Sequence, residues 1–361
     1  MTATTDPLLD FKALPKIELH AHLSGSISPQ TLHEVWRQNK ASNPLLSLPD
    51  PLIALVPGQA HSAHDLASFF TVFSKYTYHL IDDAASLTYT TLSVLRDFAA
   101  DGVAYLELRT TPRALPTPSA YVSTVLSAIR HYEATTVPLT MRTNLILSID
   151  RRNPPSTATS TLALAIHHSS PTPSSPTAAR VVGLDLCGDP SSTSTVPALL
   201  PVFHQARLAA PHLGLTLHFA ESRASSSDAE LEALLACGPD RLGHVIHVHE
   251  GVKGRVIDLA RRRGAPVGLE LCLSCNVQLG MVEGGYGGHH FKDWMGVEGC
   301  RVVLATDDVG VFGSPLSNEY RIVANEFGLG RAEICALARG AVDVIFGGEA
   351  EKERLRGLMW E

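Results

Sequence analysis

The feature that most constrains the fold of this 361-residue sequence is the alternation of eight short, strand-like segments with helical patterns. Several of these segments are apolar on both faces, as buried parallel strands are. Such alternation over this length is typical of a (β/α)8 TIM barrel, here with extra helices and surface insertions. The predicted strands span residues 17–23, 103–109, 142–149, 181–187, 215–219, 241–246, 266–272 and 301–305.

A doubly wound open sheet is the alternative α/β architecture. That fold commonly binds nucleotides through a glycine-rich turn, either G-x-G-x-x-G after the first strand or G-x-x-x-x-G-K-[ST]. Neither pattern occurs at such a place in this chain. We therefore expect a single barrel domain over residues 1–361.

Two stretches between the predicted strands lack clear periodicity. Residues 151–180 contain two clusters of Pro, Ser and Thr around a short apolar piece at 162–166. Such composition buries too little apolar surface to order itself, so we predict a flexible surface insertion over 151–180. Residues 41–64 are similarly rich in Pro, Ser and Ala, and we predict a loop or lid there.

Composition excludes several classes of function. Acidic residues outnumber basic ones, 36 to 29, and no basic block suggests binding to nucleic acid or an acidic membrane. No apolar run is long enough to span a membrane, and the N-terminus does not resemble a secretory signal. The six cysteines, including the pair in Cys272-Leu-Ser-Cys275, indicate reduced core thiols. We expect a cytoplasmic protein that acts as a monomer.

Polar residues collect at the carboxyl ends of the predicted strands, where such barrels build their sites. His20 and His22 point to the same side of the first strand, about 6.5 Å apart along it. Three imidazoles and a carboxylate suit Zn²⁺ with one position open for water, which favours hydrolytic chemistry. The other strand ends carry Asp150, Gly188, Asp189, His218, Glu221, His244, Asp307 and Asp308.

These residues also carry a resemblance to the adenosine/AMP deaminase family. The resemblance runs from about Leu14 to about residue 345, with its motifs in the family's order and spacing. It implies a metallo-dependent hydrolase barrel with one zinc ion per chain, which removes the 6-amino group of a purine by hydrolysis. The motifs that carry it are His20-Ala-His22, His218-Phe-Ala-Glu221, Arg241-Leu-Gly-His244 and Thr306-Asp307-Asp308.

By matching motif positions, the resemblance also implies a role for each residue. Glu221 would donate a proton to purine N1, and His244 would orient and deprotonate the attacking water. Asp308 would hold N7, and the backbone N–H of Gly188 would hold N3. Water attack at C6 places charge on N1, so a proton donor at N1 stabilises the intermediate. The implied zinc ligands are His20, His22, His218 and Asp307.

Other stretches are similar to the adenosine-deaminase-like branch of this family, whose members act on N6-methyl-AMP. The resemblance implies hydrolysis of N6-methyl-AMP, a small-molecule purine nucleotide, to IMP and methylamine. Asp150 is a candidate contact for the ribose or the N6 region, and Arg113, Arg151 and Arg152 are either site residues or solvated loop residues. The stretches are residues 14–20, 105–113, 150–152, 183–190, 269–276 and 289–291. The candidate contacts for the 5′-phosphate are Ser24, Thr110, Thr111 and Arg113.

Two positions depart from the family pattern. Ser24 stands where adenosine deaminases have Asp, adenine deaminases have Glu and the adenosine-deaminase-like branch has Asn. A hydroxyl there does not repel a phosphate. Val245 follows His244 where Gly is usual. An ordinary adenosine or adenine deaminase is therefore the alternative, and a catalytically inactive purine-binding protein is a third reading.

Two further histidine pairs lie outside the four motifs that carry the resemblance to the family as a whole. His247-Val-His249 repeats the spacing of the first pair, but a solvated loop is the favoured interpretation. His289-His290 precedes the last strand and indicates either a structural corner or a loop over the substrate.

Overall fold

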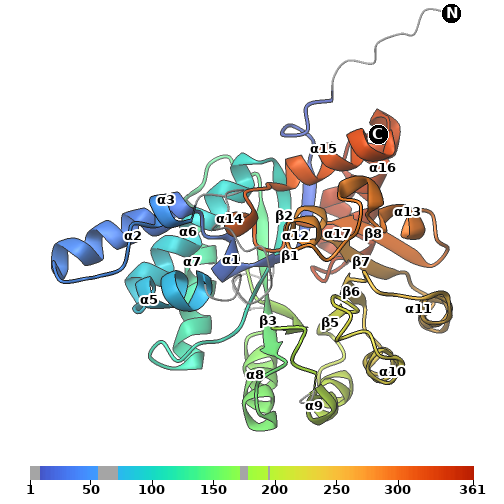
Figure 1. Ribbon diagram of the computed structural model, residues 1–361, viewed down its shortest axis with the longest axis horizontal. Coiled ribbons are helices and arrows are strands. Elements are labelled where there is room, and N and C mark those ends of the chain that lie inside the picture. Colours follow the sequence, from blue (N-terminus) through green and yellow to red (C-terminus); the bar gives the residue numbers. More distant parts are fainter. Residues whose placement is uncertain (1–8, 56–71, 171–177, 194–195) are drawn as a thin grey trace, which may run out of the picture.

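The computed structural model describes residues 9–55, 72–170, 178–193 and 196–361. Its centre is a ring of eight parallel strands that pair in chain order (Figure 1). The predicted (β/α)8 barrel is confirmed, and the strands start and end within two residues of the predicted ranges. They are β1 (Lys16–His22), β2 (Val103–Thr110), β3 (Arg142–Asp150), β4 (Val181–Cys187), β5 (Gly214–Phe219), β6 (Arg241–His244), β7 (Val267–Leu271) and β8 (Cys300–Leu304).

The ring is nearly closed where the segment after β8 meets β1. Ala21 and Asp307 form an isolated parallel bridge there. The amide of His22 donates to the carbonyl oxygen of Asp307 at 3.0 Å, and the amide of Asp307 donates to the carbonyl of His20 at 2.7 Å. The first and last strands are therefore joined at their carboxyl ends, where the predicted site residues lie.

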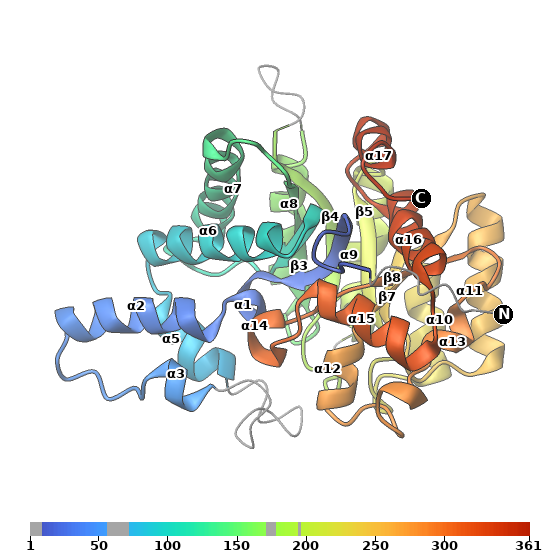
Figure 2. The same ribbon diagram turned by 90° about the horizontal axis from the view of Figure 1, so that it is seen from above.

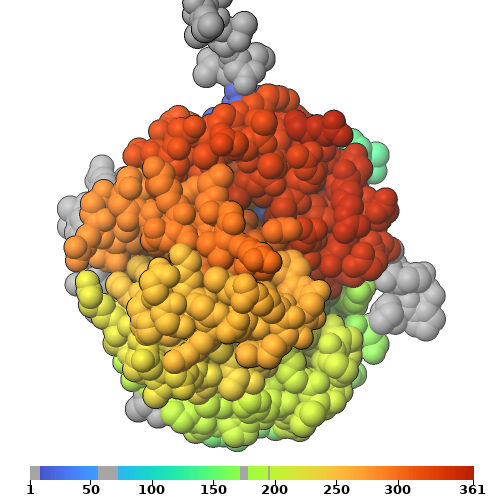
Figure 3. Space-filling model, turned by 90° about the vertical axis from the view of Figure 1, so that its right-hand side faces the viewer, coloured from blue at the N-terminus to red at the C-terminus, as the bar shows by residue number. Residues whose placement is uncertain are grey.

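Helices cover the outside of the ring, and α2 projects on the side away from α11 (Figures 1 and 2). Figure 3 shows one face on which the segments follow one another around a common centre in chain order, from green to red. The longer helices are α2 (Pro29–Ser42), α6 (Ala84–Ala100), α7 (Pro118–Thr135), α8 (Pro155–His167), α9 (Val196–Ala209), α10 (Asp228–Ala236), α11 (Glu250–Arg263), α15 (Leu316–Phe327), α16 (Arg331–Gly340) and α17 (Glu349–Arg356).

Local sequence signals set where several of these helices begin. Ser28 caps α2 by accepting a hydrogen bond from the amide of Thr31, with Pro29 at the first helical position. Asp83 and Ser86 form a reciprocal capping box at the start of α6. Shorter elements join the longer ones, namely α1 (Leu23–Ser26), α3 (Pro51–Ala54), η1 (Phe73–Thr77), α5 (Tyr78–Leu80), α12 (Leu273–Gln278), η2 (Tyr286–Gly288), α13 (Phe291–Trp294), α14 (Val309–Phe312) and η3 (Ala341–Val344).

The prediction of a flexible insertion over 151–180 is wrong for residues 155–167. Residues 155–167 form α8, the helix that connects β3 to β4. Its inner face buries Ala158, Thr161, Leu162 and Ala165, which recur at helical spacing. Residues 171–177 lie outside the described residues, as do residues 56–64 of the predicted loop or lid.

Two composition-based expectations can be compared with the structure. No helix in the described part of the chain is long and apolar enough to cross a membrane. All six cysteines are buried and unpaired, so the prediction of reduced thiols is confirmed.

The interior of the barrel contains a fully buried network of charged side chains. Arg109 on β2 lies 3.2 Å from Asp185 on β4 and 2.9 Å from Glu270 on β7. Arg241 on β6 lies 2.6 Å from both Glu270 and Glu107. All five side chains have no exposed surface. Because each charge has a partner of opposite sign, the network links the strands from the inside.

We predict that Arg241→Met destabilises the fold by about 3–5 kcal/mol, because it leaves the buried Glu107 without its cation and removes one of the two arginines that pair with Glu270. The matched control is Arg301→Met on β8, which breaks a half-exposed pair with Asp343 and is expected to cost at most about 1 kcal/mol. Denaturant unfolding of both variants gives the two free energies. Equal losses would contradict the role assigned to the buried network.

Candidate active site

The candidate site lies at the carboxyl ends of β1, β5, β6 and β8. Strand periodicity places His20 and His22 on one side of β1, and His218 and His244 lie on β5 and β6. Within the described residues, positive φ angles of non-glycine residues occur at four positions. These are Ala220, His244, Val245 and Asp307. All four follow or end these strands, and such strained backbone often marks a functional site.

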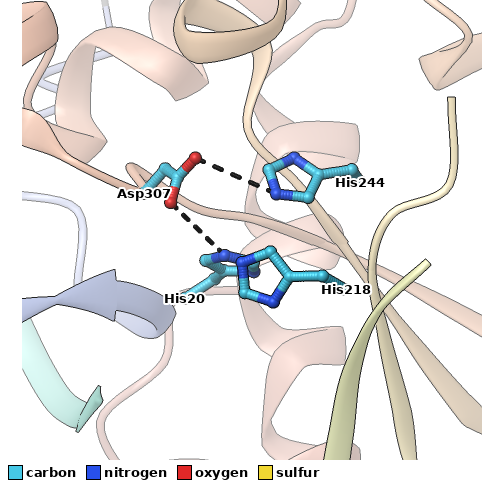
Figure 4. A group of neighbouring side chains, drawn as sticks. All are labelled: His20, His218, His244 and Asp307. Atoms are coloured by element: carbon cyan, nitrogen blue, oxygen red, sulfur yellow. Dashed lines mark ion pairs between the residues drawn. The ribbon is translucent and has the colours of Figure 1, made fainter. Parts of the chain in front are cut away.

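Four polar side chains converge on one point in this site (Figure 4). Candidate ligand atoms of His20, His218, His244 and Asp307 lie within 4.8 Å of one another. The Nε2 atom of His20 is buried and has no hydrogen-bond partner among the described residues. A cluster of imidazoles and one carboxylate with an unused nitrogen is the donor set that suits a divalent transition metal.

The distances between the candidate donor atoms also indicate which residues could bind one metal ion together. A tetrahedral ion with bonds of about 2.0–2.1 Å holds its ligand atoms about 3.3–3.4 Å apart. His22 Nε2 lies 3.3 Å from His218 Nε2, and Asp307 Oδ1 lies 3.4 Å from the Nε2 atoms of both His20 and His22. His244 Nε2 instead lies 3.9 Å from the other oxygen, Oδ2, of Asp307. The spacing favours His22 over His244 as the fourth donor.

Buried carboxylates hold two of these histidines from behind. Glu270 Oε2 lies 2.7 Å from His20 Nδ1, and Asp185 Oδ1 lies 3.1 Å from His218 Nδ1. Although burial opposes ionisation, Arg109 and Arg241 hold the pKa of Glu270 well below its usual range. A charged carboxylate keeps the proton of each ring on Nδ1, which leaves the Nε2 lone pair facing the centre.

Neither carboxylate was among the residues predicted for the site, although the sequence contains a signal for both. Asp185 and Glu270 are each the single charged residue within an otherwise apolar strand, in Val181–Cys187 and Val267–Leu271. Both side chains are fully buried. A charge in a strand buried on both faces needs a partner inside the barrel.

Glu221 and Asp308 are buried carboxyl groups on the cavity side of the cluster. Burial raises the pKa of Glu221 to about 7, so the group can carry a proton near neutral pH. Burial and the neighbouring Asp307 raise the pKa of Asp308 well above its usual range. Each group has one oxygen without a hydrogen-bond partner among the described residues. Gly25 makes room for Asp308, because a Cβ at that position would lie 1.5 Å from Asp308 Oδ1.

A cavity of about 350 Å³ opens beside the cluster. This volume is within the usual range for a small-molecule pocket. All the substrate-contact candidates from the sequence lie along its wall, together with side chains that were not predicted to do so. The lining candidates are His22, Ser24, Thr110, Thr111, Arg113, Asp150, Gly188 and Asp308, and the additional residues include Phe73, Tyr78 and Tyr121.

Two arginines line this cavity. The guanidinium of Arg113 lies 4.7 Å from the centre of the Tyr78 ring and donates to the Tyr78 carbonyl at 3.1 Å. Arg152 forms a two-point ion pair with Asp150, at 2.8 and 2.5 Å. Arg151 instead pairs with Glu230 at 3.2 Å and does not line the cavity. Of these two arginines, Arg152 lines the cavity and Arg151 does not.

Neither of the two other histidine pairs lines the cavity. His249 caps α11 and lies 2.6 Å from the exposed Asp228. His289 and His290 contact Asn276 and the backbone of His244, as a structural corner would.

Comparison with known proteins places this arrangement in a family. The family model described as adenosine deaminase matches residues 15–360. A Danio rerio protein named N6-methyl-AMP deaminase is 36% identical over 357 residues, covering 97% of this chain and 96% of the relative. A Homo sapiens protein of the same name is 32% identical over 352 residues, covering 96% and 92%. A crystal structure of Arabidopsis ADAL complexed with IMP superposes with a TM-score of 0.82 at 30% identity, covering 96% of each chain. The chain belongs to the adenosine deaminase family.

Proposed function

We propose that this protein is a zinc-dependent hydrolase that converts N6-methyl-AMP and water to IMP and methylamine. The observation that carries the proposal is one cavity that joins the His/Asp cluster to two arginines. The cluster offers the chemistry of a metal-dependent deaminase, and the arginines offer charge for a 5′-phosphate. The names of the relatives and the IMP in the Arabidopsis complex agree with this assignment.

The metal in this proposal is one Zn²⁺ ion per chain. Zn²⁺ bound at such a site lowers the pKa of a water molecule to about 7. The distances between donor atoms and the unused Nε2 of His20 support this choice of residues. The proposed ligands are His20, His22, His218 and Asp307.

The remaining side chains would orient the purine and move its protons. Glu221 would protonate N1 as the water oxygen bonds to C6, and methylamine would leave as the C6–N6 bond breaks. One proton of the water would pass to N6 as it leaves, and the other would restore the proton that Glu221 gave to N1. Asp308, whose pKa is raised by burial and by Asp307, would donate a hydrogen bond to N7 in its protonated form. The amide of Gly188 would donate to N3. His244 would orient the attacking water.

The phosphate end of the cavity would be formed by hydroxyl and guanidinium groups. Arg113 and Arg152 supply the charges, and Ser24 and Thr111 supply hydroxyls. Thr110 is less available because its hydroxyl is 2.7 Å from that of Tyr121. A charge-assisted hydrogen bond of about 1.5–3 kcal/mol corresponds to a preference of roughly 10–100-fold for nucleotide over nucleoside.

The wider setting of the enzyme is also part of the proposal. We propose that residues 1–361 act as one barrel domain, as a monomer, in the cytoplasm. The formal charge of −7 supports a small-molecule substrate rather than nucleic acid or an acidic membrane.

Glu221→Gln is expected to keep the bound metal and to lose about 10²–10⁴-fold in kcat, because the amide cannot donate a proton to N1. Metal content is measured alongside turnover of N6-methyl-AMP. A variant with normal metal content and an unchanged kcat would refute the proton-donor role.

Glu270→Gln is expected to weaken zinc binding by about 10–100-fold, because the neutral amide supports His20 less well. Competition with a chromophoric chelator, on protein shown to be folded by circular dichroism, gives the affinity. The matched control is Glu319→Gln, a buried carboxyl that contacts Ser274 and Ser314 instead of a histidine. Equal zinc affinities in the two variants would contradict the supporting role of Glu270.

A substrate panel tests the assigned specificity. We expect kcat/KM for N6-methyl-AMP to exceed that for N6-methyladenosine by roughly 10–100-fold, because only the nucleotide reaches the arginines. AMP, adenosine and adenine complete the panel. Faster turnover of adenosine or adenine would favour an ordinary adenosine or adenine deaminase. No turnover of any substrate by the zinc-loaded protein would favour the inactive purine-binding alternative.

A further inference from the structure

A hydrogen-bonded chain lies behind His244, on the side of its ring away from the cavity. It runs from the backbone amide of Phe291 through His289 and Asn276 to His244 Nδ1. We propose that Asn276 and His289 are positioning residues that fix the proton of neutral His244 on Nε2. His244 would then donate a hydrogen bond to the attacking water oxygen rather than remove a proton from it. This inference rests on the proposed function.

The donor and acceptor roles in this series of hydrogen bonds are set at the end farthest from His244. The amide of Phe291 lies 3.2 Å from His289 Nδ1, and a backbone amide can only donate. His289 Nδ1 is therefore an acceptor. Burial lowers the pKa of His289 to about 2, so the ring is neutral near pH 7. Its one proton must be on Nε2.

The next two links follow from the first. His289 Nε2 lies 3.2 Å from Asn276 Oδ1, which accepts its proton. The amide nitrogen of Asn276 then faces His244 Nδ1 at 3.1 Å and donates to it. Turning the Asn276 amide over would set its NH₂ group against another N–H donor, so the chain has one consistent direction. His244 Nδ1 is an acceptor, and the proton of the neutral ring lies on Nε2.

The surroundings of His244 Nε2 agree with a donor at that position. The atom is buried, lies 3.7 Å from Glu221 Oε1 and 3.9 Å from Asp307 Oδ2, and has no hydrogen-bond partner among the described residues. An N–H group is attracted to carboxylate oxygens, whereas a lone pair is repelled by them. The proton of the attacking water would instead pass to Glu221, which gives a proton to N1.

The adjacent histidine secures the backbone of the same residue. His290 Nε2 lies 2.7 Å from the carbonyl oxygen of His244 and donates to it, because a carbonyl can only accept. This bond holds His244 in its left-handed conformation, with a φ of 68°. His289 and His290 therefore serve the ring and the backbone of His244, respectively.

The direct test is the tautomer of His244 in the zinc-loaded wild-type protein. Two-bond ¹⁵N–¹H correlation spectra of histidine-labelled protein identify the protonated ring nitrogen, and His244→Gln assigns the signal. We expect the proton on Nε2. A proton on Nδ1 would overturn the proposal whatever the variants do, and this readout does not depend on the identity of the substrate.

Two substitutions of His289 by side chains of nearly equal size distinguish a positioning role of this residue from a packing role. His289→Gln can still donate to Asn276 and is expected to keep the Nε2 tautomer and most of kcat. His289→Glu can only accept when ionised, so it is expected to turn the Asn276 amide over and move the proton of His244 to Nδ1. We expect kcat to fall by about 10²–10⁴-fold, as for other wrong-tautomer histidines, with little change in KM.

Asn276→Asp is an independent way to move the proton of His244 from Nε2 to Nδ1. A carboxylate beside His244 Nδ1 would favour the Nδ1 proton and make Nε2 an acceptor, as a general base requires. A retained or increased kcat in this variant, or equal losses in the Gln and Glu variants of His289, would overturn the proposal. If the wild-type protein has the Nε2 tautomer but does not turn over N6-methyl-AMP, the proposed function is refuted and the proposal about the tautomer is not.

Discussion

The carboxylate of Glu270 is the interaction on which the rest of the structure depends. It contacts His20 on β1, Arg109 on β2, Thr216 on β5 and Arg241 on β6, while its own backbone lies in β7. One buried charge therefore joins five strands. A shift of one residue in the register of β7 would turn this side chain to the other face of the sheet. The same contact that fixes the barrel also aims His20 at the candidate metal position.

Strain at the strand ends is the second constraint, and it explains one departure from the family pattern. Val245 has a φ of 49° and is fully buried. A glycine would adopt this left-handed backbone without strain, whereas a β-branched residue adopts it at a cost of about 1–3 kcal/mol. The bond from His290 to the carbonyl of His244 compensates for part of that cost. The turn that ends β6 therefore depends on α13, which begins at Phe291.

Much of the fold was predictable because strand periodicity and strand ends are local properties of the chain. The period-two alternation of strand side chains predicted that His20 and His22 face the same side of the first strand. The carboxyl ends of parallel strands lie at the same end of a barrel, so the residues at those ends were expected to lie together. The helix α8 was missed because Ser, Thr and Pro dominated its composition, although Ala158, Leu162 and Ala165 have helical spacing. The contacts of Asp185, Glu270, Asn276 and His289 were not predictable, because they join residues that only the closed ring brings together. Roles for the cavity residues stay predictions.

The two ends of the cavity differ in what holds them in place. At the cluster, the ion pairs that hold His20 and His218 are buried, so solvent and salt screen them little. At the other end, Arg152 is half exposed, with 51% of its side chain accessible, and pairs with Asp150. Asp150 alone would repel a phosphate, and Arg152 neutralises it while Arg113 adds one positive charge. A carboxylate at position 24 would cancel that charge. Because the chain has Ser24 there, no carboxylate at that position offsets the charge of Arg113, which fits the proposed preference for a nucleotide over a nucleoside.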